Sequence, residues 1–600
     1  MAALPQVFPR VALSEDLKRR IGQHFVLGFH GYEIDANVTA LIREYHVGNI
    51  ILMKRNVKDI PQLRKLINSL QRLARDAGHA RPLMIGMDQE NGLVSAFSTE
   101  APNGGTLFPG AMALAATGSP ELVQTVYHAT AAEMKLAGLN WCYSPVADVN
   151  SDARNPVIGV RSFGDDPYNV SEFVRTASRG LTLSGIAPTL KHFPGHGGTH
   201  VDSHLDLPKI PKSLDDLYSL ELVPFKALIH AEPPVASIMT AHIALPFIIG
   251  SDEPASLSHK ITTEVLRMQL GYSGAVVTDC LEMDAIAGTV GVERGAVQAL
   301  QAGADIVMIC HTFEKHVGAV KEVWKAFENA ELMEDMLDAS DARVDKLKES
   351  FAGSWGDAIV ETNFEELATL KGQNQILSLE AHNLAVTVVH GPSNFVPISH
   401  LSRSRRLETQ TSIILFTPAM EVLNRAIDDA ENIVRTSDGR VRNAAGPSYE
   451  AFAAYVSDKA DQLSASSFHH ELYMAEDAPL LTAEASSCPA LALAHQATTI
   501  IFAIRNAHHS AWQLDYFEAL IRHLQRNQAD GILSRSVYVV STYAPYDIPS
   551  LQTRLASQDL QLELAYLASF DFTCSALKAV ARVIFGDIEP QGKVPVSLAL

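Results

Sequence analysis

Residues 20–350 alternate short apolar runs with amphipathic stretches, and this alternation limits the possible folds more than any other feature of the chain. Helical patterns such as 60–78 and 171–185 separate the runs. Strand-length runs that alternate with helices form parallel sheets, so eight such units over ~300 residues predict a (β/α)₈ barrel. A large open doubly wound sheet is the alternative. The runs are FVLGF (25–29), NIILM (49–53), PLMIGMD (82–88), WCYSPVADV (141–149), APTLKHF (187–193), ASIMTAH (236–242), GAVVTDC (274–280) and ADIVMIC (304–310).

Polar side chains stand at the carboxyl ends of four of these runs. They are Asp88, Lys191 with His192, His242 and Asp279. Barrel enzymes carry out their chemistry at this face of the barrel. Because polar residues recur at this position in four separate strand–helix units, we predict an active site at this face of the barrel.

A second alternating region begins near residue 382, after a charged helical stretch (334–350) and a mixed segment. Its pattern predicts a smaller open α/β sheet domain. We therefore predict a barrel domain in residues 1–350, a linker in 351–378 and an α/β sandwich domain in 379–600. The apolar runs of the second region are LAVTVVH (384–390), SIILFTP (412–418), TIIFAIRN (499–506) and VYVVSTY (537–543).

Charge and cysteine content narrow the classes of function. The 600 residues include 48 Lys and Arg against 68 Asp and Glu, a net charge of −20, which disfavours nucleic acid and anionic membranes as partners. The five cysteines stand far apart without a CxxC pair, which disfavours a zinc ribbon and a disulfide framework. The N-terminal residues lack the pattern of a signal peptide, so a cytoplasmic location is predicted. Polar residues interrupt the charge-free stretch 485–504, which indicates buried core and not a membrane span.

The segment KHFPGHGGTHVDSH (191–204) is the densest in chemical groups. Its histidines recur at four-residue intervals, which on a helix would suggest a metal site, but Pro194 and three glycines disfavour a helix, so no metal is predicted. Asp202 can reach His204 on such a loop and favour its imidazolium, a competent general acid. A solvated Asp-Ser-His turn is the alternative.

Three further carboxylate and guanidinium positions are candidates for binding or catalysis. Asp279 ends a buried strand and can act as a nucleophile, or it can cap the following helix. Asp88, in MIGMDQENGLV (84–94), can bind sugar hydroxyls. Arg161, in the Gly-flanked segment 155–167, can bind a hydroxyl or carbonyl oxygen, or it can form a structural ion pair.

Together these motifs resemble glycoside hydrolase family three, in its β-N-acetylglucosaminidase branch. KHFPGHG followed by DSH is a specific signature of this branch. YAPYDI (543–548) and ARVIFGDIEPQGKVPVSL (581–598) resemble the family's second, flavodoxin-like domain. Other segments resemble the barrel strands and loops of the family: GNIILMKRN (48–56), MDQENGLV (87–94), YSPVADVN (143–150), NPVIGVRSFG (155–164) and VVTDCLEM (276–283).

The resemblance implies a role for each candidate residue. Asp279 would be the catalytic nucleophile, and His204 would be the general acid/base with Asp202 as its partner. The remaining candidates would bind and position the sugar: Asp88, Arg161, Lys191 and His192. Departures from the family pattern are Leu93, where an arginine is usual, and Gly198 and His200, where Asp is frequent.

The function that the resemblance implies is a retaining exo-β-N-acetylglucosaminidase acting on small carbohydrates without a cofactor. Because a neutral imidazole does not repel an anion, phosphate could replace water, which leaves a phosphorylase as an alternative. A β-glucosidase of the same family, a non-catalytic sugar-binding barrel and a metal-dependent amidohydrolase are further alternatives. Two questions stay open: the oligomeric state, and whether the second domain contributes a loop such as His508-His509 to the active site. No acetyltransferase domain of the kind carried by some fungal relatives is expected.

Overall fold

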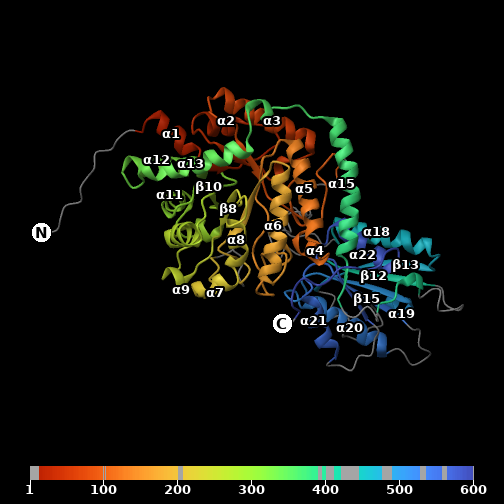
Figure 1. Ribbon diagram of the computed structural model, residues 1–600. Helices are drawn as coiled ribbons and strands as arrows, with labels where there is room; N and C mark the ends of the chain where they lie inside the picture. Colours follow the sequence, from red (N-terminus) through yellow and green to blue (C-terminus); the bar gives the residue numbers. More distant parts are fainter. Residues whose placement is uncertain are drawn as a thin grey trace.

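The computed structural model describes residues 13–98, 101, 103–199, 207–389, 395–400, 411–419, 445–475, 489–526, 535–556 and 564–598. Its N-terminal part is a closed barrel of parallel strands surrounded by helices (Figure 1). The strand order is β1-β10-β9-β8-β7-β6-β3-β2, and β1 pairs with β10 to close the ring. Closure rules out the open sheet and confirms the predicted (β/α)₈ barrel.

Each barrel strand lies within one of the eight apolar runs of the sequence. All of these strands are almost completely buried, because helices cover the outside and side chains fill the inside. The strands are β1 (Phe25–Leu27), β2 (Asn49–Ile51), β3 (Met84–Met87), β6 (Trp141–Cys142), β7 (Ala187–Phe193), β8 (Ser237–Thr240), β9 (Ala275–Cys280) and β10 (Ile306–Ile309).

Several of the surrounding helices begin at a residue whose side chain caps the helix. Helix α3 (Ile60–Asp76) begins after Asp59, whose side chain accepts a hydrogen bond from the backbone N–H of Gln62, and it buries a leucine-rich face. Other helices of this part are α1 (Glu15–Gly22), α2 (Ala36–Arg43), α4 (Ala111–Ala116), α5 (Pro120–Ala137), α6 (Pro167–Leu183), α7 (Leu214–Ser219), α8 (Leu222–Ile229), α9 (Pro246–Ile249), α10 (Asp284–Ala287), α11 (Val292–Ala302), α12 (Phe313–Glu328) and α13 (Glu334–Phe351).

The C-terminal part is built on a sheet with the order β11-β16-β15-β14-β12-β13. Strands β12 to β16 are parallel, and their order along the sheet is the 2-1-3-4-5 order of flavodoxin-like folds. The short β11 adds an antiparallel edge. The predicted flavodoxin-like domain is therefore confirmed. The strands are β11 (Thr387–Val388), β12 (Ser412–Pro418), β13 (Ser467–Tyr473), β14 (Thr499–Ile504), β15 (Ser536–Ser541) and β16 (Leu564–Ala568).

Helices cover both faces of this sheet, and two separate apolar clusters lie beneath them. On one face lie α18 (Pro447–Gln462) and α22 (Cys574–Phe585), and on the other lie α19 (Pro489–Gln496), α20 (Trp512–Arg526) and α21 (Asp547–Ala556). This arrangement makes the second part a three-layer α/β sandwich (Figure 1).

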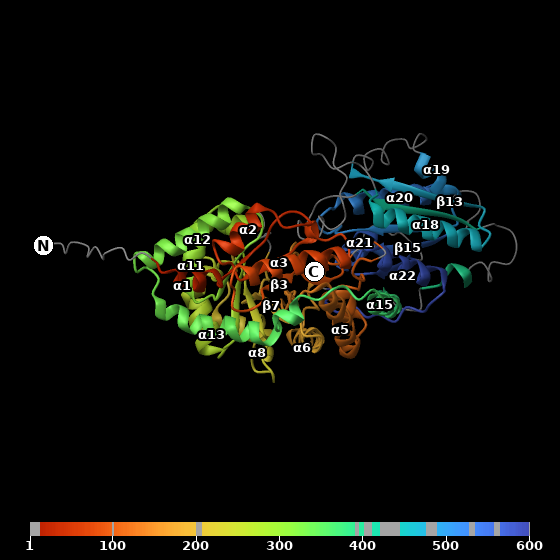
Figure 2. The ribbon, with the colours of Figure 1, turned by 90° about the horizontal axis from the view of Figure 1, so that it is seen from above.

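Between the two parts, the predicted linker 351–378 contains α14 (Trp355–Ala358) and most of the long helix α15 (Phe364–Ala385). Helix α15 lies beside α5 of the barrel and α22 of the sandwich (Figure 2). Its buried face includes polar residues: the Asn374 amide donates to Glu133 at 2.8 Å, and the Ser378 hydroxyl donates to the Leu107 carbonyl at 2.6 Å. The domain boundaries drawn from the sequence stay a prediction.

The two parts are in direct contact. Leu93, Met112 and Val160 of the barrel share one apolar cluster with Tyr543 and Phe570 of the sandwich. Gly92 approaches Gly110 so closely, with φ of +59°, that a Cβ at residue 92 would lie 2.6 Å from the Gly110 Cα. Gly92 and Gly110 therefore bring two barrel segments together next to Leu93, which contacts the second part.

Among the described helices, none is both long and apolar enough to cross a membrane.

Candidate active site

A cavity of about 890 Å³ opens at the carboxyl ends of the barrel strands. Five of the seven predicted site residues line it, and it is also lined by Glu90, which the sequence analysis did not select. The five are Asp88, Arg161, Lys191, His192 and Asp279. The structure therefore brings together side chains that are up to 191 positions apart in the sequence, from Asp88 to Asp279.

Asp279 is the penultimate residue of β9 and is half-buried at the cavity wall. The backbone N–H of Cys280 donates to its Oδ1 at 2.7 Å. The buried His242 ring lies 3.0 Å from the Cys280 carbonyl through Nε2 and 2.7 Å from the Ser256 hydroxyl through Nδ1. A carbonyl can only accept, so Nε2 carries the proton, and burial lowers the pKa of His242, which keeps the ring neutral. The strand end that carries Asp279 is thus held in place by hydrogen bonds.

A buried cluster of alternating charges forms another part of the wall. Lys191, on β7, places its Nζ 2.6 Å from both Asp88 Oδ1 and Glu90 Oε1. Arg161 forms a bidentate pair with Glu90, with both N–O distances at 2.8 Å. Each cation faces a carboxylate, and only the Asp88 side chain is substantially exposed to the cavity, at 33%.

The charges of this cluster are fixed by their neighbours. Burial opposes the charged form of each group, but Arg161 and Lys191 outweigh it and lower the pKa of Glu90 to about 2. Against the same burial, Asp88 and Glu90 raise the pKa of Lys191 to about 12. The lysine ammonium and the Glu90 carboxylate are therefore both charged at neutral pH.

His192 is oriented by Asp148, a fully buried carboxylate. Its Nδ1 lies 2.7 Å from Asp148 Oδ2, and the backbone N–H groups of His192 and His196 donate to Asp148 Oδ1 at 3.1 and 2.7 Å. Burial acts against the carboxylate, but the two histidines hold the pKa of Asp148 below its usual value. The anion fixes the proton of His192 on Nδ1, and Nε2 lies 3.5 Å from Arg161 Nη2.

Glu90 and Asp148 were missed by the sequence reasoning. Glu90 follows Asp88 by two residues at the start of the hairpin β4 (Gln89–Asn91) and β5 (Val94–Ser95), so both carboxylates can face one side of an extended chain. This two-residue spacing could have indicated that Glu90 lies near Asp88 in the site. Asp148 lies in a loop and had no periodic signal, because its partners come from the segment 192–196.

The predicted acid/base His204 and its partner Asp202 lie outside the described residues. The described chain before them ends at Thr199, whose hydroxyl lies 3.1 Å from His196 Nδ1. Asn155 donates to the His196 carbonyl at 2.8 Å and to the Thr199 hydroxyl at 3.2 Å. The segment leading to residue 200 is therefore attached to the barrel loop that begins at Asn155.

The second domain touches this same barrel loop. Its His508 lies 2.7 Å from Asp547 through Nδ1. A small cavity of about 140 Å³ lies between the domains, lined by His508, His509 and Tyr546 together with Asn155 and Gly159 of the barrel. The His508-His509 pair thus faces the loop that supports the site and does not line the larger cavity among the described residues.

Neutralising Glu90 tests the importance of the buried charge cluster. Glu90→Gln leaves the Arg161 and Lys191 cations with one carboxylate fewer in a buried site, and we expect the midpoint of thermal unfolding of the barrel to fall by roughly 4–7 °C. Glu172→Gln is the matched control, because the Glu172–Arg175 pair is about half exposed and should contribute roughly 1 kcal/mol or less. Equal midpoints for the two variants in differential scanning calorimetry would show that the cluster is not a stabilising feature.

The fold and the cavity together define a two-domain barrel protein with a charged binding site at the carboxyl ends of its strands. Residues 16–347, more than half of the chain, match the Glycosyl hydrolase family 3 N terminal domain. The chain therefore belongs to glycosyl hydrolase family 3.

Similar proteins and structures carry related names. Beta-hexosaminidase A of Pseudoalteromonas piscicida is 34% identical over 333 residues, covering 52% of this chain and 54% of that protein. A structure of a fungal multi-domain GH3 beta-N-acetylglucosaminidase with a GCN5-related glucosamine N-acetyltransferase region is 32% identical with a TM-score of 0.80, covering 97% of this chain and 60% of that one. The GH3 beta-N-acetylglucosaminidase of Paenibacillus sp. str. FPU-7 is 30% identical with a TM-score of 0.77, covering 98% of this chain and 99% of that one. This chain thus spans about half the length of the Pseudoalteromonas relative and 60% of the fungal one.

Proposed function

We propose that this protein is a retaining exo-β-N-acetylglucosaminidase that removes terminal β-linked N-acetylglucosamine from small carbohydrates. The observation that carries the proposal is the placement of Asp279 at the end of β9, on the wall of a cavity that also presents Asp88, Lys191 and Arg161. A carboxylate nucleophile beside groups that hydrogen-bond hydroxyls is the arrangement that glycoside cleavage requires. The names of the relatives support the same activity and the choice of sugar.

In the proposed reaction, Asp279 attacks the anomeric carbon while His204 donates a proton to the departing oxygen. A covalent glycosyl-enzyme results. His204, now neutral, then takes a proton from water, and the oxygen of that water displaces Asp279 from the anomeric carbon. Two displacements at one carbon retain its configuration. Asp202 would favour the imidazolium form of His204 before the first step.

Sugar binding in this proposal falls to the charged cluster. The partly exposed Asp88 carboxylate accepts hydrogen bonds from ring hydroxyls, while Lys191 and Arg161 donate to hydroxyl oxygens. Glu90 and Asp148 do not act on the sugar but hold Lys191, Arg161 and His192 in place. Charged hydrogen bonds to a neutral sugar give orientation as well as affinity.

Location is a further part of the proposal. Among the described residues, Cys142, Cys280 and Cys310 are thiols that form no disulfide. Because unpaired thiols are typical of reducing compartments, we place the protein in the cytoplasm.

Sugar selectivity tests the proposed function. We expect kcat/KM for an aryl N-acetylglucosaminide to exceed that for the glucoside with the same leaving group by roughly 100-fold or more, because the site would lose contacts to the acetamido group. The measurement is the release of the same phenol from both substrates. Comparable rates would contradict the proposal and favour the β-glucosidase alternative.

Running the same assay with and without phosphate separates hydrolysis from phosphorolysis. Free N-acetylglucosamine as the product in both conditions supports hydrolysis. A sugar 1-phosphate as the main product would instead make the protein a phosphorylase.

A further inference from the structure

We propose that Cys280, Cys310 and His311 form a binding site for a thiophilic divalent cation, of the class of Zn²⁺ and Cd²⁺, and that its occupancy inhibits the enzyme. The site lies in the same cavity as Asp279 but uses none of the residues to which a role in catalysis or sugar binding is given above. The inhibition rests on the proposed function, whereas the binding does not.

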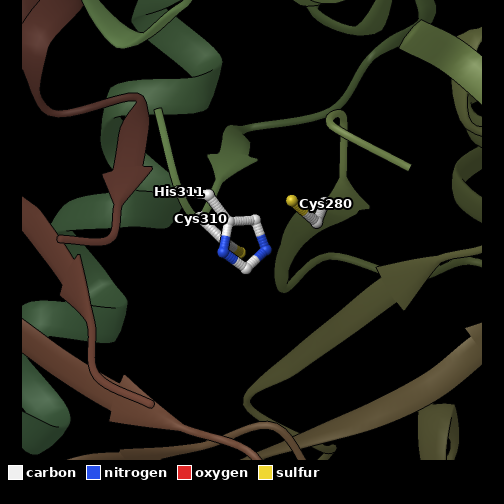
Figure 3. A group of neighbouring side chains, drawn as sticks. All are labelled: Cys280, Cys310 and His311. Atoms are coloured by element: carbon white, nitrogen blue, oxygen red, sulfur yellow. The ribbon is translucent and has the colours of Figure 1, made fainter. Parts of the chain in front are cut away.

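The two cysteines are brought together by the pairing of two barrel strands. Cys280 is the last residue of β9, and Cys310 directly follows β10. The strands are parallel neighbours, with Met308 in register with Cys280, so their carboxyl ends lie side by side. His311 is the next residue after Cys310, and Figure 3 shows its imidazole together with both sulfur atoms at the ends of the two strands.

The distances suit coordination of one ion. The two Sγ atoms and a ring nitrogen of His311 all lie within 4.8 Å of one another. Sulfur atoms bound to a single tetrahedral zinc lie about 3.8 Å apart, given a Zn–S distance of about 2.3 Å. A shift of about 1 Å, within reach of side-chain rotation, would bring the three ligands around one ion and leave the fourth position open.

The chemistry of these ligands selects the cation. Thiolates and imidazole bind Zn²⁺ and Cd²⁺ in preference to Mg²⁺ or Ca²⁺, which require oxygen ligands. Both cysteines are unpaired, and both line the cavity, so an ion can reach them without passing through the core. His311 is exposed.

Charged side chains around the three ligands affect the binding of a cation. Glu282 accepts hydrogen bonds from the backbone N–H groups of His311 and Thr312, at 2.5 and 3.2 Å, and Asp279 is adjacent to Cys280 in the chain. Both carboxylates favour a cation, and Glu282 also lies 3.8 Å from the Lys315 ammonium, which offsets part of its charge. The nearby Arg55 opposes it, but its guanidinium donates to the Cys310 carbonyl at 2.6 Å and to the Phe29 carbonyl at 3.0 Å, so it is held by the backbone.

An ion at this site would interfere with the proposed chemistry. Asp279 directly precedes Cys280, and both line one cavity. A dication bound there attracts the Asp279 carboxylate, either as the fourth ligand or through its charge, and so weakens it as a nucleophile. The bound metal would therefore inhibit the enzyme. It would not be a catalytic metal, whose removal would abolish activity.

Binding is measured first, without reference to activity. We expect equilibrium dialysis of the whole protein with Cd²⁺ to give one ion per chain, together with the ultraviolet absorption of cadmium–thiolate bonds. Cys280→Ser and His311→Ala should each weaken binding by roughly 100-fold, because each removes one of three protein ligands. Cys574→Ser is the matched control, since this half-buried thiol lies in the second domain. It should bind as the unsubstituted protein does.

The outcomes separate the site from the proposed function. Absence of the thiolate absorption, or unchanged binding by both Cys280→Ser and His311→Ala, would overturn the site. His311 is exposed, so His311→Ala keeps the test valid even if a buried cysteine variant does not fold. If Zn²⁺ binds but N-acetylglucosaminide cleavage proceeds at the metal-free rate, the inhibition is overturned and the site stands. If Zn²⁺ binds and the metal-free protein cleaves no glycoside, the proposed function fails while the site stands.

Discussion

Replacing Asp279 with alanine is expected to reduce kcat/KM on aryl N-acetylglucosaminides by roughly four to six orders of magnitude. The alanine variant cannot form the glycosyl-enzyme, and no other group is proposed to take over the attack on the anomeric carbon. The fold should persist, because Asp279 is half-buried at a strand end and lines the cavity instead of packing in the core.

Two comparisons distinguish loss of the nucleophile from general damage. Asp284→Ala removes another carboxylate that lines the same cavity, five residues further along the chain, and should reduce kcat/KM far less. Azide added to the Asp279→Ala variant should restore part of the turnover and give the α-glycosyl azide, since a small anion can attack from the emptied position. Near-normal turnover by a folded Asp279→Ala protein would remove Asp279 from this role.

Replacing His204 with alanine is expected to have an effect that depends on the leaving group. Substrates with poor leaving groups need protonation as the bond breaks, so their kcat/KM should fall by roughly 100-fold to 10,000-fold. Activated phenols depart as stable anions, so their kcat/KM should fall much less. The measurement is a plot of log kcat/KM against leaving-group pKa for both proteins, with a steeper slope for the variant.

Asp202→Asn is the matched variant for the partner of His204. Losing the negative charge should lower the imidazole pKa, so the pH range in which the acid form is present should move to lower pH, with a smaller loss of rate than in His204→Ala. If His204→Ala lost the same factor on every substrate, His204 would be a binding residue and the acid would have to be sought elsewhere.

The barrel could be predicted because each of its strands is buried on both faces. Such strands are continuous apolar runs, and runs such as ADIVMIC and GAVVTDC stand out between amphipathic helices without any knowledge of their partners. In the second domain β12, β14 and β15 were visible for the same reason.

Some of the elements that were not predicted have polar sequences, whereas β16, LAYLA, is apolar and was also not predicted. Strand β13, SFHHELY, is the edge of its sheet and is only partly buried, so it has no apolar run. The hairpin β4–β5 is buried through hydrogen bonds: Gln89 donates to Ser95 and Ser98 at 2.8 and 3.0 Å. Burial achieved by polar contacts leaves no periodic apolar signal in the sequence.

In the site, too, some residues could be predicted from the sequence and others could not. Asp88, Lys191 and Asp279 were found because they follow apolar runs, a position that the barrel fold turns into a shared face. The sequence left two interpretations of Arg161 open, a binding residue and a structural ion pair. In the structure Arg161 forms an ion pair with Glu90 and also lines the cavity. Neither this pair nor the contact of His192 with Asp148 could be derived from spacing, since the partners are 71 and 44 residues apart.

Trapping the covalent intermediate tests the central claim most directly. A ring-fluorinated N-acetylglucosaminyl fluoride combines a good leaving group with a slowed second displacement, so the glycosyl-enzyme should accumulate. Digestion and mass spectrometry of the inactivated protein should place one N-acetylglucosaminyl adduct on Asp279, and free N-acetylglucosamine should prevent its formation. An adduct on another residue, or turnover of an N-acetylglucosaminide with inversion at the anomeric carbon and no adduct, would contradict the account.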